Sequence, residues 1–363
     1  MQKAIIIINS RILSALGTIE QTTDSLFSGK TGIQPGPSFG VPVPCAPFQD
    51  LSFRRLEKIT EVLSFKIQDN KSLLFIYCAA KGDLSDLESF YHQKGPCSII
   101  NSLLEIQSRK IITYLKIRPS KSTIISAACA SGAAAIDYAK RYLIQGIYSD
   151  VLIFGYDVIS EFVVKGFHSL GALSHDPARP FDKSRNGLTL GDGAALIHLT
   201  YDKPSVGDIL ISGTATSNDA NHRTGPSRTG EGLLRAINTV LQDSNLTPED
   251  IGAIKCHGTA TNYNDAMEAK ALFSCFKDNI PPCVSFKGAI GHTSGAGSLL
   301  EIAIAANLIK RKSLPPTIGF EYLGVDEPLP IRSSSQQFEK DSILCLSAGF
   351  GGLNAAIVIR EHR

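Results

Sequence analysis

An internal repeat constrains the fold of this 363-residue chain more than any other feature of its sequence. The pentapeptide CASGA begins at Cys129, and the similar pentapeptide HTSGA begins at His292, 163 residues later. Each precedes a helix-like run that ends in LI followed by polar residues. The double alanines that begin at 194 and at 355 have nearly the same offset, 161 residues. Two independent matches at nearly one offset predict a duplicated structural unit.

Short apolar runs alternate with longer helix-like runs along the chain. They predict strands at 4–8, 73–78, 123–127, 151–155, 194–199, 207–213, 252–256, 283–286, 343–347 and 355–359. Helices are predicted at 50–66, 97–116, 131–145, 230–244, 265–277 and 295–310. This alternation favours an α/β protein whose sheets are covered on both faces. We expect two halves, 1–203 and 204–363, joined where Pro204 and Gly207 interrupt the periodicity.

Composition excludes several classes of protein. Hydrophobic residues make up 43% of the chain and charged residues 19%, a balance typical of a globular protein. The net charge of +2 provides no basic field for nucleic acid. The apolar run 4–8 is too short to span a membrane and lacks the features of a signal peptide. The eight scattered cysteines form neither a disulfide framework nor C-x-x-C metal pairs, so we expect a cytoplasmic protein without a metal site.

Cys129 is the first candidate for chemistry. A thiol acts as a nucleophile in its thiolate form, which a helix N-terminus or a neighbouring imidazole favours. Equivalent loops of a duplicated unit should meet near a pseudo-twofold axis, which would bring His292 close to Cys129. The alternative interpretation is that Cys129 is a small apolar residue in a tight turn, because free cysteine is often buried.

Three further segments carry candidates. His257 follows a predicted strand, Lys287 precedes His292 by five residues, and the glycine-rich turn 349–352 lies between two predicted strands. Backbone N–H groups in such a turn are free to face an oxyanion. Each also has a simpler interpretation: a histidine satisfied within a loop, a surface lysine and an ordinary hairpin. Their order along the chain, together with the repeat, favours a single catalytic site.

Four motifs in order resemble those of the elongating β-ketoacyl-[acyl carrier protein] synthases of the thiolase superfamily. They are Ala128-Cys129-Ala130-Ser131, then His257-Gly258-Thr259-Ala260-Thr261 with Asp265 and Glu268, then Lys287, Gly291 and His292 with Glu301, and finally Gly349-Phe350-Gly351-Gly352-Leu353-Asn354. The resemblance implies a thiolase fold, with two duplicated α/β halves in five layers, α-β-α-β-α.

The resemblance also assigns roles to these residues. Cys129 would carry the acyl group, and His257 and His292 would assist the decarboxylation of malonyl-carrier. The backbone N–H groups of Cys129 and Phe350 would form an oxyanion hole, with Phe350 also gating the pocket. Lys287 would be the fourth catalytic residue, paired with Glu301 to orient the site. Glu301, Asp265 and Glu268 would be supporting residues, and Thr259 and Thr261 would hydrogen-bond the phosphopantetheine arm.

The implied reaction is a decarboxylative Claisen condensation in fatty acid, polyketide or aryl polyene assembly. It needs no metal or redox cofactor, and its partners would be acyl carrier protein and a second subunit, in a homodimer or a heterodimer. Because carrier protein is acidic in this family, basic residues should bind it. The candidates are Arg54, Arg55, Lys58, Arg179 and Arg185. The helix segment around Lys58 could equally be a solvated face.

Two departures from the family bear on the function. The region before Cys129 is shorter than is typical, and Leu188 stands where the family has an aromatic residue. The short region motivates an alternative, a mainly structural subunit that completes a heterodimeric ketosynthase. A thiolase is disfavoured because two histidines are present where thiolases have a second catalytic cysteine.

Overall fold

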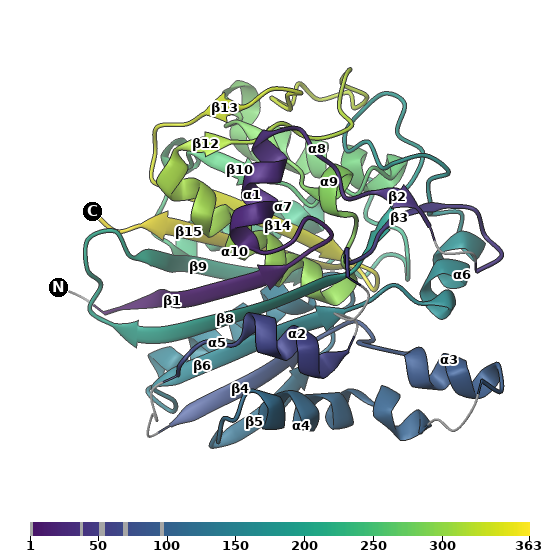
Figure 1. Cartoon of the computed structure of the whole chain (residues 1–363). Coiled ribbons are helices and arrows are strands. Elements are labelled where there is room, and N and C mark those ends of the chain that lie inside the picture. The colour runs from purple at the N-terminus through teal and green to yellow at the C-terminus, as the bar shows by residue number, and fades with distance from the viewer. Residues whose placement is uncertain (1–2, 37–38, 51–54, 68–71, 95–97) are drawn as a thin grey trace.

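A large central sheet organises the chain in a computed structural model that describes residues 3–36, 39–50, 55–67, 72–94 and 98–363. Ten strands lie in the order β11-β10-β14-β15-β9-β1-β8-β6-β4-β5 (Figure 1). Those of the first half are β1 (Ala4–Leu13), β4 (Leu73–Cys78), β5 (Lys121–Ile125), β6 (Asp150–Asp157) and β8 (Gly193–Asp202). Those of the second half are β9 (Ile209–Asn218), β10 (Ala253–Lys255), β11 (Cys283–Val284), β14 (Ser342–Gly349) and β15 (Leu353–Glu361).

The two halves of the sheet have the same topology. In the first half β5, β4 and β6 are parallel, and β8 and β1 follow antiparallel. In the second half β11, β10 and β14 are parallel, and β15 and β9 follow antiparallel. The halves meet where residues 5–7 of β1 pair with residues 209–211 of β9. The predicted duplication of an α/β unit is therefore confirmed, whereas the division into domains at 203 and 204 stays a prediction.

The helices are arranged around and between the two half-sheets. They are α1 (Ile19–Phe27), α2 (Leu56–Leu63), α3 (Ser85–Tyr91), α4 (Leu104–Tyr114), α5 (Ser131–Ile144), α6 (Glu161–Ser169), α7 (Glu231–Asp243), α8 (Asn262–Phe276), α9 (Lys287–Ile290) and α10 (Gly297–Arg311). Short strands complete the chain: β2 (Gln34–Pro35), β3 (Pro44–Ala46), β7 (Leu190–Gly191), β12 (Ser313–Leu314) and β13 (Gln336–Gln337). Among the described residues, no helix combines the length and apolar character needed to cross a membrane.

Alternation along the strands generates three apolar cores between five layers. On β6, Leu152 and Phe154 pack toward α2 and α4, whereas Val151 and Ile153 pack toward α5 and α10. On β15, the same period of two sends Ala355 and Ile357 to the α5 and α10 side, and Ala356 and Val358 to α7 and α8. Because both faces of each half-sheet are covered, their strands read as continuous apolar runs. The five-layer arrangement predicted from the sequence is present.

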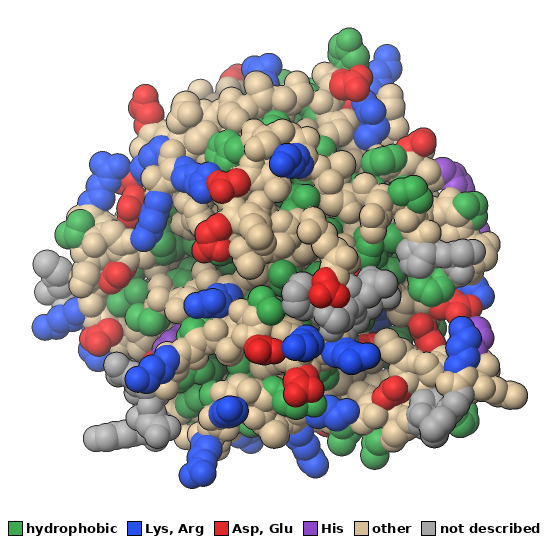
Figure 2. Space-filling view, in the orientation of Figure 1, with side chains coloured by type: hydrophobic (Ala, Val, Ile, Leu, Met, Phe, Trp, Pro, Cys, Tyr) green, Lys and Arg blue, Asp and Glu red, His purple; other side chains and the backbone are tan. Residues whose placement is uncertain are grey.

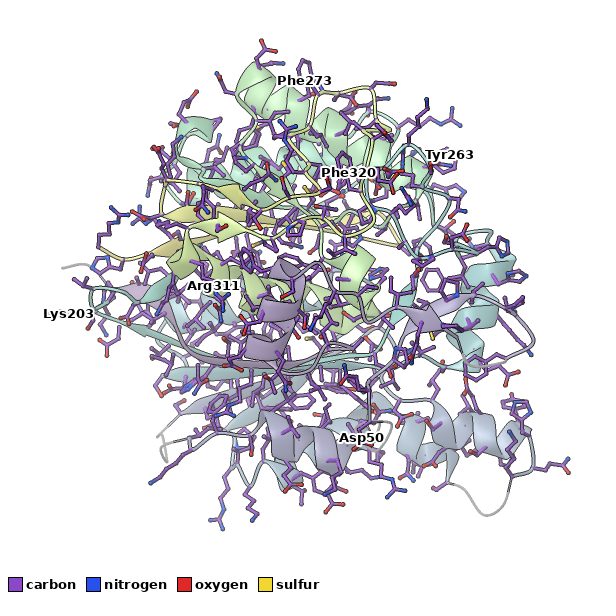
Figure 3. The ribbon with its side chains drawn as sticks, turned by 45° about the horizontal axis from the view of Figure 1, so that its top comes forward. Asp50, Lys203, Tyr263, Phe273, Arg311 and Phe320 are labelled. Atoms are coloured by element: carbon purple, nitrogen blue, oxygen red, sulfur yellow. The ribbon has the colours of Figure 1, made fainter. Side chains whose placement is uncertain are left out.

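The helices differ from the sequence predictions mainly in length. The helix expected over 50–66 is α2, which begins at Leu56, and that expected over 97–116 is α4, which a 3-10 turn at Ile99–Ser102 precedes. Four of the described helices, α1, α3, α6 and the short α9, were not predicted. Helix α3 has no buried residue and therefore no apolar periodicity to detect. Helix α1 lies against the end of α10, where Arg311, labelled in Figure 3, pairs with Asp24 at 3.0 Å.

The two central helices approach each other very closely at Gly132 in the first turn of α5. A Cβ atom there would lie 2.5 Å from the backbone nitrogen of Leu299 and 2.7 Å from its Cβ atom on α10. The glycine is therefore required by packing, and the contact fixes the N-terminal end of α5 against α10.

Gly132→Ala is expected to lower the free energy of unfolding by about 1–3 kcal/mol, because the added methyl group overpacks this crossing. Urea denaturation measures the change. Gly166→Ala in α6 is the matched control, since its Cβ atom would meet nothing within 4 Å. Gly166→Ala should raise the free energy of unfolding by up to about 1 kcal/mol, because alanine has the higher helix propensity. Equal stability of Gly132→Ala and the wild type would contradict the role given to this contact.

Candidate active site

Cys129 lies in the tight loop between β5 and α5, two residues before the helix begins. The preceding Ala128 has φ +47°, a left-handed conformation that is strained for a residue with a Cβ atom. The equivalent position in the repeat, Gly291 before His292, has φ +69°. In both halves, therefore, the residue before the candidate catalytic side chain has a positive φ.

The Cys129 side chain is 9% exposed and faces two backbone donors. The N–H groups of Phe350 and of Cys129 itself both interact with its sulfur. Burial raises the pKa of this thiol to about 11, while the Lys287 ammonium and these N–H groups oppose the rise. The two N–H groups expected to form an oxyanion hole thus face the sulfur, and their role as oxyanion donors stays a prediction. Together with the Lys287 ammonium they favour the thiolate.

His257 and His292 lie together beside the thiol on the wall of one cavity. Their ring centroids are 5.5 Å apart, with the ring planes at 86°. Burial lowers the pKa of His292 to about 3, and the Lys287 ammonium adds to this shift. Burial likewise lowers the pKa of His257 well below its usual value, with contributions from Lys287 and His292. Both imidazoles are therefore neutral at pH 7.

A carboxylate on α8 holds the His257 loop. Glu268 accepts hydrogen bonds from the backbone N–H groups of His257 at 2.5 Å and Gly258 at 2.8 Å. Asp265, one turn earlier, accepts from the N–H of Phe181 at 2.7 Å. Burial raises the pKa of Glu268 to about 7 and that of Asp265 to about 6, in each case against the backbone donors. These acids shape the loop and do not line the cavity.

Lys287 belongs to a buried charge cluster. Its Nζ atom donates to the carbonyl of His257 at 2.7 Å and to Oε1 of Glu301 at 2.6 Å. The other carboxylate oxygen, Oε2, accepts from Nζ of Lys255 at 2.7 Å. The interpretation of Lys287 as a surface lysine is wrong, since it is 2% exposed. The predicted pairing of Lys287 with Glu301 is confirmed.

Sequence reasoning missed Lys255, although a signal was present. It stands in the segment 252–256, which was predicted to be an apolar strand, and a charged residue inside such a strand is unusual. In the structure it is 1% exposed.

The cavity at this site has a volume of about 340 Å³. Thr259 and Thr261 line it, with their hydroxyl oxygens 2.9 Å apart. The first turn of α8 contributes Tyr263, labelled in Figure 3, which is 71% exposed. The apolar wall comes from Phe167, Leu170, Leu188 and Phe350. The rings of Phe167 and Phe350 are 5.4 Å apart.

The segment after β9 forms part of the rim and is bonded to the glycine turn. The N–H of Gly351 donates to the carbonyl of Arg223 at 2.7 Å, and the N–H of Asp219 donates to the carbonyl of Gly352 at 2.8 Å. The turn joins two strands, β14 and β15, as predicted, and Gly351 and Gly352 in it have positive φ. Among the described residues, no cluster of three His, Cys, Asp or Glu side chains could hold a metal ion.

The structure argues against Arg185 as a residue for carrier binding. Its side chain is 8% exposed and donates to the carbonyls of Asp182 and Gly324. Arg179 pairs with the acids Asp182 and Glu321 but is 29% exposed, so its role in carrier binding stays a prediction.

The helix α2 candidates remain exposed. Arg55 is exposed at the start of α2, and Lys58 pairs with Glu61 at 3.5 Å. Arg54 lies outside the described residues. Over α2 and α4, Lys and Arg side chains are interspersed with Asp and Glu (Figure 2).

The chain belongs to the β-ketoacyl synthase family. The family model of the N-terminal domain matches residues 110–203, and that of the C-terminal domain matches residues 209–321. A 3-oxoacyl-[acyl-carrier-protein] synthase 2 of Coxiella burnetii is 29% identical over 282 residues, covering 73% of this chain and 67% of the relative. The ketoacyl synthase alpha subunit of the tetracenomycin polyketide synthase of Streptomyces glaucescens is 31% identical over 266 residues, covering 66% and 60%.

Solved structures show the same fold. A chain from the complex of a ketosynthase with its chain length factor from Xenorhabdus doucetiae has a TM-score of 0.83 at 24% identity, covering 99% of this chain and 98% of that one. This likeness confirms the expected thiolase fold. The chain spans 59% to 67% of the length of the first curated relatives it matches.

The neutral state of His292 predicts a specific loss of stability in acid. In the unfolded chain this imidazole has a pKa near 6.5 and is protonated below that pH. In the folded protein it stays neutral until the pH falls to about 3, so acid favours the unfolded state. The stabilisation is therefore complete above about pH 6.5 and is lost as the pH falls toward 3. Between pH 7 and 4.5 the wild type should lose about 2–3 kcal/mol more than His292→Asn.

Urea denaturation at several pH values measures this difference. Cys129→Ala is the control, because it changes the same cavity wall while the thiol titrates near pH 11, outside this range. Parallel pH profiles for the wild type and His292→Asn would refute the assignment of a neutral buried imidazole.

Proposed function

We propose that this chain is a β-ketoacyl synthase that loads an acyl group on Cys129 and condenses it with a malonyl unit delivered by acyl carrier protein. The observation that carries the proposal is the convergence on one cavity of a thiol, two neutral imidazoles and two backbone N–H donors. Family membership supports the same reaction class.

In the first step the Cys129 thiolate attacks the carbonyl carbon of an acyl thioester. The N–H groups of Cys129 and Phe350 stabilise the negative charge that develops on the carbonyl oxygen. The bond from carbon to the carrier's sulfur then breaks, and the carrier leaves as a free thiol after taking up a proton. The acyl group remains as a thioester on Cys129.

In the second step malonyl-carrier loses carbon dioxide, and the electron pair of the broken C–C bond passes into an enolate on the thioester. Neutral imidazoles suit this step because each can donate a hydrogen bond to the enolate oxygen. The α-carbon then attacks the acyl carbonyl carbon, and the bond to Sγ of Cys129 breaks to release β-ketoacyl-carrier. Electrons balance without an external oxidant or reductant, so we propose no redox cofactor or metal.

Other cavity residues fit the carrier's arm. The hydroxyl groups of Thr259 and Thr261 can hydrogen-bond the amides of phosphopantetheine, and the exposed Tyr263 lies nearby at the rim. Phe350, in contact with Phe167, closes the apolar side where the acyl chain would enter. Lys287, which is held by Glu301, donates to the carbonyl of His257 and so orients its loop.

The second candidate function is a partner subunit of a heterodimeric ketosynthase. The family match begins only at residue 110, so the first part of the chain is divergent. The similar Xenorhabdus doucetiae structure contains a chain length factor. Against this reading, the thiol, both histidines and Lys287 are all in place. In either case we expect the chain to act as part of a dimer.

Intact-protein mass spectrometry after incubation with acyl-carrier thioesters tests the first step. The wild type should gain the mass of one acyl group and Cys129→Ala should gain none, because the acyl group would be bonded to this sulfur. Cys275→Ala, at the partly exposed thiol of α8, is the matched control and should be acylated normally. A folded wild type that accepts no acyl group from any donor would favour the partner-subunit function instead.

A further inference from the structure

Lys255 places a charge where the strand pattern calls for an apolar side chain. On β10, Ala253 packs into the central core and Ile254 into the outer core. Lys255, two residues after Ala253, lies on the central face, and it is 1% exposed. A buried ammonium is costly unless it is paired, so its presence calls for an explanation beyond packing.

The charges around Lys255 do not balance. Its Nζ atom donates to Oε2 of Glu301 and, at 2.6 Å, to the carbonyl of Leu346. Oε1 of the same carboxylate pairs with Lys287. Burial alone would raise the pKa of Glu301, but the two ammonium groups outweigh it and keep the group ionised. Burial lowers the pKa of Lys287, Glu301 opposes this shift and the Lys255 ammonium adds to it. With Lys287 protonated, two ammonium groups share one carboxylate, and one positive charge is left over.

Nearby titratable groups do not cancel this excess. The ones that act on Lys255 are Glu301 on α10, Cys345 on β14 and Glu268 on α8. Burial raises the pKa of Cys345 to about 12 and that of Glu268 to about 7, so the thiol is neutral and the second carboxyl is only partly ionised near pH 7. The cluster keeps a net positive charge beside the cavity.

The excess charge acts on the residues that line the cavity. Lys287 is the strongest influence that opposes the effect of burial on the pKa of the Cys129 thiol, whereas the Asp157 carboxylate adds to the rise. Lys255 and Lys287 both disfavour the charged forms of His257 and His292. A positive charge thus favours a thiolate together with two neutral imidazoles. Those are the protonation states that the proposed reaction requires.

We propose that Lys255 is a positioning residue that takes one oxygen of Glu301, prevents Glu301 from neutralising Lys287 and thereby holds the cavity at a net positive charge. Its use in catalysis rests on the proposed function, whereas its effect on the Cys129 thiol does not.

The test is the pH dependence of Cys129 alkylation by iodoacetamide, followed by peptide mass spectrometry. In Lys255→Met the charges of Glu301 and Lys287 cancel, so the cluster has no net charge. The pKa of Cys129 should then rise by about one unit, and alkylation below that pKa should slow about tenfold. Lys255→Arg keeps the charge and should keep the wild-type pH profile. If Lys255→Met does not fold, Lys255→Gln serves for the same comparison.

A double variant separates charge from structure. Lys255→Met combined with Glu301→Gln again leaves one uncompensated ammonium, on Lys287, and should recover most of the lost alkylation rate. A purely structural role predicts that the double variant is at least as impaired as the single one. Lys140→Met is the matched control, because Lys140 is also mostly buried and ion-paired, with Asp243, on the far part of α5. Cys129 in Lys140→Met should be alkylated with the same pH profile as in the wild type.

An unchanged Cys129 pH profile in folded Lys255→Met, or no recovery in the double variant, would overturn the inference. Because alkylation needs no carrier substrate, the result is separate from the acylation experiment. A shifted alkylation profile in a protein that accepts no acyl group would uphold the role of Lys255 and reject the proposed synthase activity.

Discussion

The packing of α5 against α10 between two half-sheets is the contact on which the site depends. Each helix begins directly after a functional loop, so fixing the two N-terminal ends together also fixes Cys129 beside His292. The absence of a side chain at Gly132 and the hydrogen bond from the N–H of Ala133 to Oγ of Ser298, at 2.9 Å, define this crossing. A thiol and an imidazole that are 163 residues apart in sequence reach one cavity wall because of helix packing.

Burial determines the protonation states at this wall more than any single partner does. It is the largest influence on the pKa values of Cys129, His257 and His292, and it favours the neutral form of each. Burial alone therefore keeps the two imidazoles neutral, but it disfavours the Cys129 thiolate. The charge cluster at Glu301 supplies the opposing influence, so the site combines buried ionisable side chains with positive charge behind them.

The sequence contained most of this arrangement. The offset between Cys129 and His292 predicted both the duplication and the meeting of the two loops, since equivalent loops of a repeat are related by symmetry. His257 and Lys287 were candidates from their positions in the sequence, and the resemblance to a family assigned their roles and supplied Glu301. Lys255 escaped notice because no motif contains it, and its meaning depends on a carboxylate 46 residues away in sequence. Arg185 was misjudged for a related reason: its carbonyl partner at Gly324 comes from a distant loop.

The seam between the half-sheets is narrow, because β1 and β9 pair only through residues 5–7 and 209–211. Cohesion must therefore come chiefly from the helices between them: α5, encoded in the first half, contacts β9 and β15 of the second half, and α10, encoded in the second, contacts β8 and β1 of the first. Neither half alone could bury the apolar inner face of its half-sheet. Separate expression of the two halves should therefore give two chains that fold only when they are mixed, since each supplies the helix that covers the other's sheet.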